Sequence, residues 1–567
     1  MSHPAPAGLP AGPPSGPDTA PDDAPVTELL RRYRRARTRR RSWEGAWHDC
    51  YDYALPSRES ALGGSTPGAA RGDRLFDGTA PDAVDQLAAS MLAQLTPPWS
   101  RWFDLTAGAD LTEDERARMA PTLEHAAEVL RGQFAASNFA VEIHQAYLDL
   151  VTLGTACLAF EEAPPGEPSA FRFAAVSMGD VALDEGPTGR LDTVFRRIRL
   201  PLTAVRARWP GAVLPPELEN RAAREPDLDV AVLECVVPDA RGYGYTALLA
   251  GAGDALGTLA DVGVDIGDAI AAPPVVLATG HFAVSPFLCF RWLKAPGEVY
   301  GRSPVMKALP DIKTANKVVE LVLKNASIAV TGIWQADDDG VLNPATVRLV
   351  PGTIIPKAVG SAGLTPLRAA GDFDVSQLVL DGLRARIRHA LLADKLGQPD
   401  SPGMTATEVV HRAADMARVL GASYGRLQSE LLAPLIRRGL AILRRRGEIP
   451  PIRLDGRLVD LTHASPLAQQ QRMADAQTTL TWINAVQGLG EGGAGVVDTE
   501  GAARWLARTL GVPDAAVRPA APDPPASTPP AAPPPTPSAA PPDWTALAQR
   551  LGAALASPTG GPPNVAR

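Results

Sequence analysis

The residues of this chain best suited to chemistry with a charged partner are its seven lysines, all of which lie within residues 294–395. Lys313, Lys317 and Lys324 are spaced by four and seven residues, and Glu320 lies between the last two. At roughly 100° per residue, this spacing places the four side chains on one stripe of one helix. Lysine carries a compact charge on a flexible stem, so the stripe could make weak, repeated contacts with phosphate groups. The other side chains of this helix are apolar or small, which indicates a helix surrounded by neighbours and exposed to water along one edge, as in a ring of subunits around an aqueous pore. The alternative is a long helix across the bottom of a large domain.

A second polar stripe follows the first. Residues 331–372 contain turn signals between apolar runs, which predict a small β insertion. Residues 373–393 then resume a helical pattern, whose polar stripe is formed by Asp374, Gln377, Asp381, Arg384 and Arg388. The sequence therefore predicts two similar helices on either side of one compact β unit.

Residues 394–404 separate this second helix from the next helical segment. They include Gly397, Gln398, Asp400, Ser401 and Gly403, together with two prolines. So many helix-breaking residues predict a loop that is mobile or specially placed.

A basic run lies near the N-terminus, within a helix-compatible stretch that Pro56 ends. Its arginines include Arg31, Arg32, Arg34, Arg35, Arg39, Arg40 and Arg41. Such a run could grip phosphate. A solvated helical face, or contact with an acidic protein partner, explains it equally well.

Patterns typical of catalysis have little support. Residues 421–425 match the G-x-S-x-G nucleophile elbow, but an elbow needs a strand before its serine, and Ser423 falls inside a helical run. The glycines of this motif are better explained by close approach of helices. The sequence contains neither a phosphate-binding P-loop nor an H-E-x-x-H zinc motif, and its histidines are dispersed. We therefore expect no enzyme activity, no cofactor and no metal site.

Composition restricts the class of protein. The 567 residues carry a net charge of −8, which argues against a protein that coats DNA but allows a channel through which DNA slides. The four cysteines (Cys50, Cys157, Cys235, Cys289) lie far apart, which predicts buried thiols in a reducing compartment. The sequence shows neither an apolar run long enough for a membrane span nor a signal-peptide core.

The remaining segments complete the predicted organisation. Residues 1–25 are of low complexity and expected to be disordered. Three helical segments occupy about 80–155, where Trp99 and Trp102 are expected core anchors, and short β-like runs fill 157–292. A capping box at 405–408 opens a long helix to about 446, which Pro434 should kink. Further helices are expected at 466–487 and 498–511, then a Pro/Ala linker at 513–542 and a short amphipathic helix near the end.

Several segments together resemble a known family. They are YALP, LTPPWSRWFDL, SNFAVEIHQAYLDLVTLGTACLAFEE, the block containing GEVYGRSPVMKALPDIKTANKV, MTATEV and YGRLQSELLAPLIRRGL. In this order and spacing, over about residues 26–515, they resemble the portal proteins, or head-to-tail connectors, of short-tailed bacteriophages. The Pro-rich tail and the N-terminal arginine run depart from the family pattern.

The resemblance implies an α+β, mainly helical portal fold with a β-rich middle region. It identifies 26–307 as the wing, 308–330 and 373–393 as two stem helices, and 331–372 as a small β clip. It also implies a tunnel loop at 394–404, a long kinked wing helix at 405–446 and a helical crown at 447–512. Residues 513–542 would be a linker, and 543–567 a short C-terminal helix and tail.

The resemblance also implies a function. Family members form a ring, usually of twelve copies, at one capsid vertex of the virion, which is assembled in the host cytoplasm. DNA is packaged and ejected through the ring, the clip meets the terminase and later the tail adaptor, and the wing meets the major capsid or scaffolding protein. No membrane is involved.

The polar stripes acquire a role in such a ring. Lys313, Lys317, Lys324, Arg384 and Arg388 would face double-stranded DNA across a shared lumen. Salt bridges between adjacent stems, for instance from Lys317 or Lys324 to Asp374 or Asp381, are the alternative. Among whole-protein alternatives, another head-tail adaptor or a capsid scaffold comes next, and a motor enzyme or nuclease is more remote because the P-loop is missing.

Overall fold

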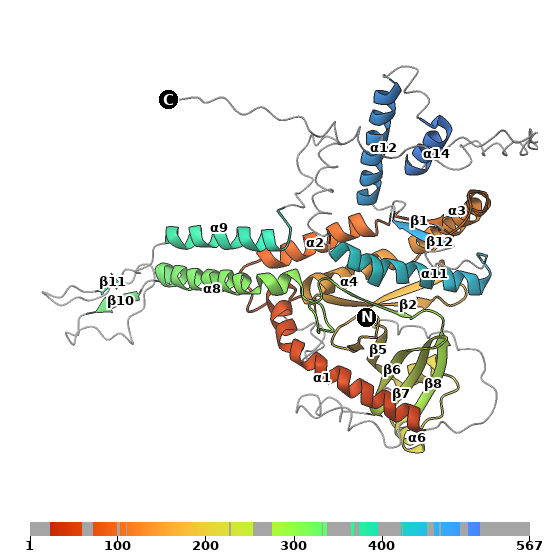
Figure 1. The fold of residues 1–567 in the computed structure, drawn as a ribbon. Coiled ribbons are helices and arrows are strands. Elements are labelled where there is room, and N and C mark those ends of the chain that lie inside the picture. Colours follow the sequence, from red (N-terminus) through yellow and green to blue (C-terminus); the bar gives the residue numbers. More distant parts are fainter. Residues whose placement is uncertain are drawn as a thin grey trace, which may run out of the picture. The chain divides into compact units, whose positions relative to one another are not determined.

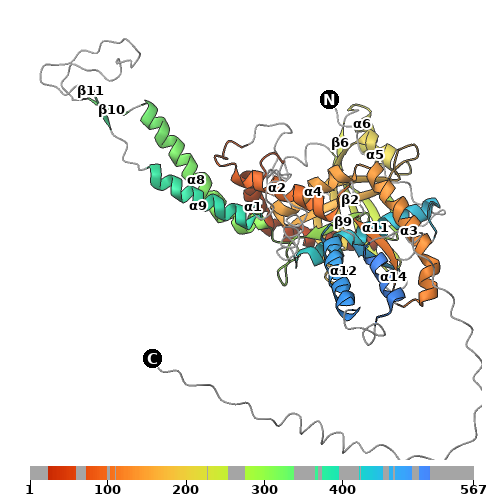
Figure 2. The ribbon, with the colours of Figure 1, turned by 90° about the horizontal axis from the view of Figure 1, so that it is seen from above.

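Helices and antiparallel strands alternate along the chain in the computed structural model, with helices predominating (Figures 1 and 2). Residues 1–517 form one compact unit and residues 518–567 a second. The structure describes residues 23–58, 72–98, 102–108, 110–225, 228–252, 275–331, 333–336, 364–367, 373–394, 421, 423–450, 459–463, 466–487 and 497–510. The predicted disordered N-terminus up to residue 22, the tunnel loop from 395 on, the linker and the C-terminal helix lie outside these residues.

The three predicted helices of the N-terminal part are present as α2 (Thr79–Leu95), α3 (Glu113–Ala136) and α4 (Phe139–Leu153). A capping box between Thr112 and Glu115 begins α3, and Gly154, with φ at 81°, ends α4 in the left-handed conformation that glycine favours. Trp102 is buried as expected, stacked 6.1 Å from Phe139. Trp99 lies outside the described residues.

The predicted β-rich middle region contains two antiparallel sheets. The smaller has strand order β3-β2-β9, from β2 (Thr155–Glu162), β3 (Phe171–Val176) and β9 (Phe287–Arg291). The larger has order β4-β5-β6-β7-β8 and contains β4 (Val181–Asp184), β5 (Thr193–Pro201), β6 (Asp229–Asp239), β7 (Gly242–Ala252) and β8 (Val275–Phe282). Two short helices, α5 (Leu202–Arg208) and α6 (Pro216–Ala222), lie between β5 and β6 in the chain.

All four cysteines are buried and free, as the sequence predicts. Cys157 on β2 is paired in register with Cys289 on β9, and their sulfur atoms are 3.5 Å apart. Cys235 lies in β6, opposite Phe195 of β5.

A long helix, α1 (Asp23–Ala54), packs against the larger sheet, and Figure 1 shows it in red crossing in front of these strands. Val26, Leu30, Tyr33 and Ala36 form a small apolar cluster with sheet residues, in which the Tyr33 and Phe195 rings are 5.6 Å apart. The helix begins at Asp23, slightly before the predicted boundary at residue 26.

The two predicted stem helices are α8 (Pro304–Thr331) and α9 (Phe373–Ala390), which lie side by side in both views (Figures 1 and 2). At their far end, β10 (Ile333–Ala336) and β11 (Leu364–Leu367) pair antiparallel in the segment predicted as a small β unit. Its other residues lie outside the described part of the chain.

The predicted long helix at 405–446 is described from residue 421 onward. It contains a π-helical turn, η2 (Gln428–Leu432), followed directly by α11 (Ala433–Arg446). Pro434 lies in the first turn of α11, so its missing N–H falls where the hydrogen-bonding pattern already changes. A π-helical turn thus directly precedes the helix that contains the proline, and a kink at Pro434 stays a prediction.

The described residues show no close approach at Gly421 and Gly425. A β-carbon at either position would meet nothing within 4 Å among the described residues. Close packing occurs instead at Gly439 in α11, where a β-carbon would lie 2.6 Å from Leu130 of α3.

The C-terminal part of the described chain contains one element that the sequence did not predict. Strand β12 (Val459–His463) pairs antiparallel with β1 (Phe103–Ala107), which precedes α3. The expected helices follow as α12 (Pro466–Gln487) and α14 (Thr499–Leu510). The start of the predicted crown is thereby joined to the N-terminal helical region.

Candidate functional site

The lysine stripe of α8 is present, and its outer part is exposed. The side chains of Lys317 and Lys324 are 61% and 64% exposed. Glu320 lies between them, with Oε2 at 3.0 Å from Lys317 Nζ and Oε1 at 2.5 Å from Lys324 Nζ. The hydrogen bonds from Lys324 and Lys317 lower the pKa of Glu320, so it is ionised at neutral pH. The three groups leave one net positive charge on this part of the stripe.

Lys313, at the inner end of the stripe, is in contact with α1. Its Nζ is 2.7 Å from Asp49 Oδ2 and lies 5.4 Å from the centre of the Tyr53 ring. Both partners come from a helix far away in the sequence. Lys313 therefore has partners on another helix, whereas among the described residues the two outer lysines contact only Glu320 of their own helix.

The stripe of α9 is also tied to another part of the protomer by an ion pair. Arg384 Nη2 is 2.8 Å from Asp77 Oδ2, and Asp77, just before α2, is buried. Burial raises the pKa of Asp77, but hydrogen bonds from Thr79 and Arg384 outweigh this effect and lower it. Of the two arginines predicted to face DNA from α9, Arg384 thus has an ion-pair partner in its own protomer, and Arg388 is exposed.

The directions of the two stripes follow from one ion pair between the helices. Arg386 of α9 contacts Asp311 of α8 at 2.7 Å. Asp311 precedes Lys313 by two residues, so at about 100° per residue the two side chains leave α8 roughly 160° apart. The lysine stripe consequently faces away from α9, and Figure 1 shows α1 and α9 on opposite sides of α8.

The two stripes therefore reach different elements within the protomer, and their common position around a lumen stays a prediction. The α8 stripe turns toward α1, whereas Arg384 of α9 reaches Asp77, two residues before α2. The sequence pattern shows which residues share one face of one helix, but it does not show how two faces are turned relative to each other.

The N-terminal arginine run holds α1 against the sheet region. Arg35 and Arg39 each contact a different carboxylate oxygen of Asp184, both at 2.6 Å. Arg40 is buried and donates to the carbonyl oxygens of Gly179 and Val181. Arg32 donates to Thr193 and Arg31 to Glu28, while Arg34 and Arg41 also have interactions. Most of the run thus contacts other groups of its own protomer.

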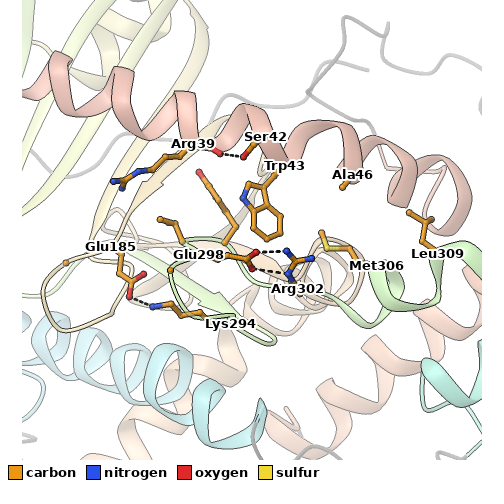
Figure 3. A pocket seen from close by; sticks show the side chains of 14 residues that line it. Arg39, Ser42, Trp43, Ala46, Glu185, Lys294, Glu298, Arg302, Met306 and Leu309 are labelled. Carbon is orange, nitrogen blue, oxygen red and sulfur yellow. Dashed lines mark hydrogen bonds and ion pairs between the residues drawn. The ribbon is translucent and has the colours of Figure 1, made fainter.

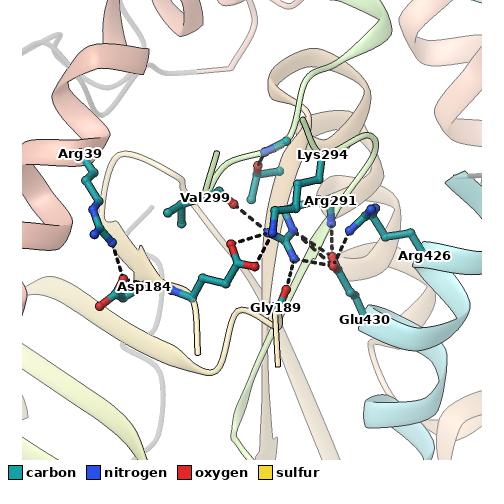
Figure 4. A network of polar contacts seen from close by, with 11 residues as sticks. Arg39, Asp184, Gly189, Arg291, Lys294, Val299, Arg426 and Glu430 are labelled. Atoms are coloured by element: carbon teal, nitrogen blue, oxygen red, sulfur yellow. Dashed lines mark hydrogen bonds and ion pairs between the residues drawn. The ribbon is translucent and has the colours of Figure 1, made fainter. Parts of the chain in front are cut away.

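A buried polar cluster connects the smaller sheet to the π-helical turn (Figure 4). Arg291, at the end of β9, is fully buried and donates through Nη2 to Glu430 at 2.6 Å. Its guanidinium also donates to the carbonyl oxygens of Val299 and Gly189, at 3.0 and 2.7 Å. Glu430 further accepts from the backbone N–H of Arg291 and from Arg426. The cluster fixes the segment leading into α8 relative to the helix that contains Glu430.

A groove of about 920 Å³ lies between α1 and the segment leading into α8 (Figure 3). Its apolar residues include Trp43, Met306 and Leu309. Its charged residues all have ion-pair partners: Lys294 pairs with Glu185, Arg302 with Glu298, and Arg39 with Asp184 outside the groove. Because these charges neutralise each other, the groove has the character of a packing surface more than of a reaction centre.

The residues of the apparent nucleophile elbow lie in a helix, as expected, which is the wrong context for that motif. The described part of the chain contains no group of three or more His, Cys, Asp or Glu side chains that could hold a metal ion. In the same residues, each helix is too short or too polar to cross a membrane.

Sequence reasoning missed the partners that hold the two stripes in place. Asp49, Tyr53 and Asp77 lie far from α8 and α9 in the sequence, and nothing in their local pattern singles them out. Glu320, by contrast, was already apparent from its spacing within the lysine stripe.

The chain resembles phage proteins over most of its length. It is 26% identical over 489 residues to the probable portal protein of Bordetella phage BPP-1, covering 82% of this chain and 83% of that protein. It is 23% identical over 428 residues to the portal protein of Enterobacteria phage T3, covering 73% and 74%. A further match, to the portal protein of Escherichia phage T7, is 26% identical over 168 residues and covers 30% and 31%.

Solved structures with some likeness come from particles of a gene transfer agent. A chain from the virion of a native particle has a TM-score of 0.32 and 12% identity, covering 77% of this chain and 91% of that one. A chain from the neck of the native particle, in C12 symmetry, has a TM-score of 0.33 and 13% identity with the same coverage. Residues 26–517 match the family model described as bacteriophage head to tail connecting protein, and the chain therefore belongs to that family.

Proposed function

We propose that twelve copies of this chain form a ring at one capsid vertex of a virion, where the ring is the channel for DNA packaging and ejection. The match of residues 26–517 to the head to tail connecting family carries this proposal. The relatives named as portal proteins cover most of this chain, which favours a portal over the alternative of a separate adaptor or scaffold. The role is mechanical, and ATP hydrolysis would belong to a separate terminase.

The exposed outer stripe of α8 is suited to the lumen of such a ring. Lys317 and Lys324 are both held by Glu320, so each copy offers one net positive charge instead of two. Exposed charges of this kind are screened by salt and attract phosphate only weakly. A band of such weak contacts holds DNA near the axis without stopping its movement. Arg388 belongs to the same proposal but lies at the inner end of α9, four residues beyond Arg384 along the helix. Lys313 and Arg384 would also act at this end, where each already has an ion-pair partner.

Other parts of the chain would serve partners of the ring. The β unit at 331–372 would be the clip that meets the terminase and then the tail adaptor. The wing would contact the major capsid or scaffolding protein. Residues 394–404 would form a tunnel loop that narrows the channel.

Two measurements test the proposal. Negative-stain images of the purified protein should show rings with a central hole, and a uniformly monomeric protein would contradict the function. The double variant Lys317→Gln, Lys324→Gln should form normal rings, but particles built with it should contain less DNA. The reason is that Glu320 would turn the stripe from net positive to net negative.

A matched control is available on the same helix. Lys307 is also exposed, but its side chain points about 120° away from that of Lys313 around the helix axis. It therefore lies outside the stripe. Lys307→Gln should leave DNA packaging unchanged. Equal packaging by the double variant and this control would refute a DNA contact at the stripe.

A further inference from the structure

The outer half of α8 has more apolar surface than the described residues of its own protomer cover. Five large aliphatic residues lie between Val318 and Leu323, yet none of the described side chains in 317–327 is buried. Among the described side chains of this helix, the buried ones all lie at or before Asn316. Soluble helices normally bury such residues, so a further partner is indicated for this half of α8.

Two of these side chains leave α8 on opposite edges. Leu321 follows Glu320 by one residue and is 50% exposed, whereas Leu323 precedes Lys324 by one and is 53% exposed. At roughly 100° per residue, the two leucines lie on either side of the charged stripe. They differ in height along the helix by only about 3 Å.

The helix thus has four distinct sides in this region. One side faces α9, as the contact between Asp311 and Arg386 shows, and the opposite side carries the charged stripe. The two remaining edges each present an exposed leucine. A single unrelated partner packed on one edge would leave the other leucine in water.

A ring of identical copies covers both edges at once. Its interfaces are heterologous, because the surface that a copy presents to its left differs from the one it presents to its right. We infer that the Leu321 edge of α8 packs against the Leu323 edge of the next copy of this chain, with the charged stripe between them left open to the lumen. This inference rests on the proposed ring and identifies one of its contacts.

Disulfide trapping in the assembled full-length protein tests the contact. The double variant Leu321→Cys, Leu323→Cys, oxidised as purified rings, should give a ladder of covalent oligomers on a non-reducing gel. Each single variant should stay monomeric on the same gel, because in a heterologous interface a residue does not meet its own copy. The four native cysteines are buried and should contribute no cross-links.

A thiol-reactive bismaleimide should be used in parallel, because it links two cysteines that are close together but do not meet the strict geometry of a disulfide. The control double variant Leu323→Cys, Val213→Cys pairs one stem position with an equally apolar residue that is 81% exposed elsewhere, and it should give no ladder.

The outcomes separate this inference from the function on which it rests. Rings that give no ladder with either reagent would overturn the inference and leave the channel function standing. Dimers from either single variant would also overturn it, since they require a symmetric contact. If the unmodified protein forms no rings, the proposed function itself fails.

Discussion

Removal of the carboxylate of Glu430 should loosen the junction between β9 and the π-helical turn. Glu430 accepts from Arg291 Nη2 at 2.6 Å and from the Arg291 backbone N–H at 3.0 Å. The variant Glu430→Ala would leave the fully buried guanidinium with two carbonyl acceptors and the more distant carboxylate of Glu185, at 3.6 Å.

The expected cost follows from burial. Breaking a buried ion pair by removing one partner destabilises a protein by about 3–5 kcal/mol when the other charge is left without compensation. Because Glu185 still lies 3.6 Å from the Arg291 guanidinium, we expect a cost near the lower end of this range. If opening of this junction exposes the amides of α11, that loss speeds their hydrogen exchange by roughly two to three orders of magnitude, at about 1.4 kcal/mol per tenfold. Hydrogen–deuterium exchange on peptides covering residues 433–446 measures this directly.

Two variants control for loss of contacts in general. Arg426→Ala removes a partly exposed partner of the same carboxylate, with its side chain 29% exposed, and should cost less than about 1 kcal/mol. Replacing both members of the buried pair, by Arg291→Met with Glu430→Leu, should restore most of the lost protection, because apolar residues of similar volume pack there without a charge. The reasoning is refuted if Glu430→Ala exchanges no faster than Arg426→Ala.

Further predictions concern pH, packing and the tunnel loop. Burial raises the pKa of Asp149 to about 6 against the opposing effect of Arg58, so its contribution to stability is complete at acid pH and lost as the pH rises through 6. Urea titrations would compare the unfolding free energy of the unmodified protein with that of the variant Asp149→Asn. Between pH 4.5 and 7.5 this difference should shift by about 2 kcal/mol against the unmodified protein, and a difference that stays constant would contradict the prediction. Gly439→Ala should destabilise by about 1–3 kcal/mol through overpacking against Leu130, whereas Gly425→Ala, which meets open space, should stabilise slightly; equal unfolding midpoints would disprove it. Deleting residues 397–403 should leave rings intact but let packaged DNA leak, as nuclease protection would reveal, and fully retained genomes would speak against a constriction.

Local patterns predicted most of the helices correctly. The three helices before β2, the pair α8 and α9, and the helices α12 and α14 all follow from apolar periodicity with breakers at their ends. The lysine stripe is equally local, because residues four and seven apart on a helix share a face wherever that helix lies. The pairing of β12 with β1 was not predictable in this way, since strand partners far apart in sequence leave no trace in either segment alone.

The amino-acid sequence by itself determined the family, the helical pair with its intervening β unit, and the set of side chains on each polar stripe, since these depend on residue order and helical repeat. Only the tertiary structure decided which of these side chains are tied to other elements of the protomer. It paired Lys313 with Asp49 and Arg384 with Asp77 and left Lys317 and Lys324 exposed. The physical reason is that the partners belong to α1 and to the segment before α2, and chain folding alone brings those charges within contact distance.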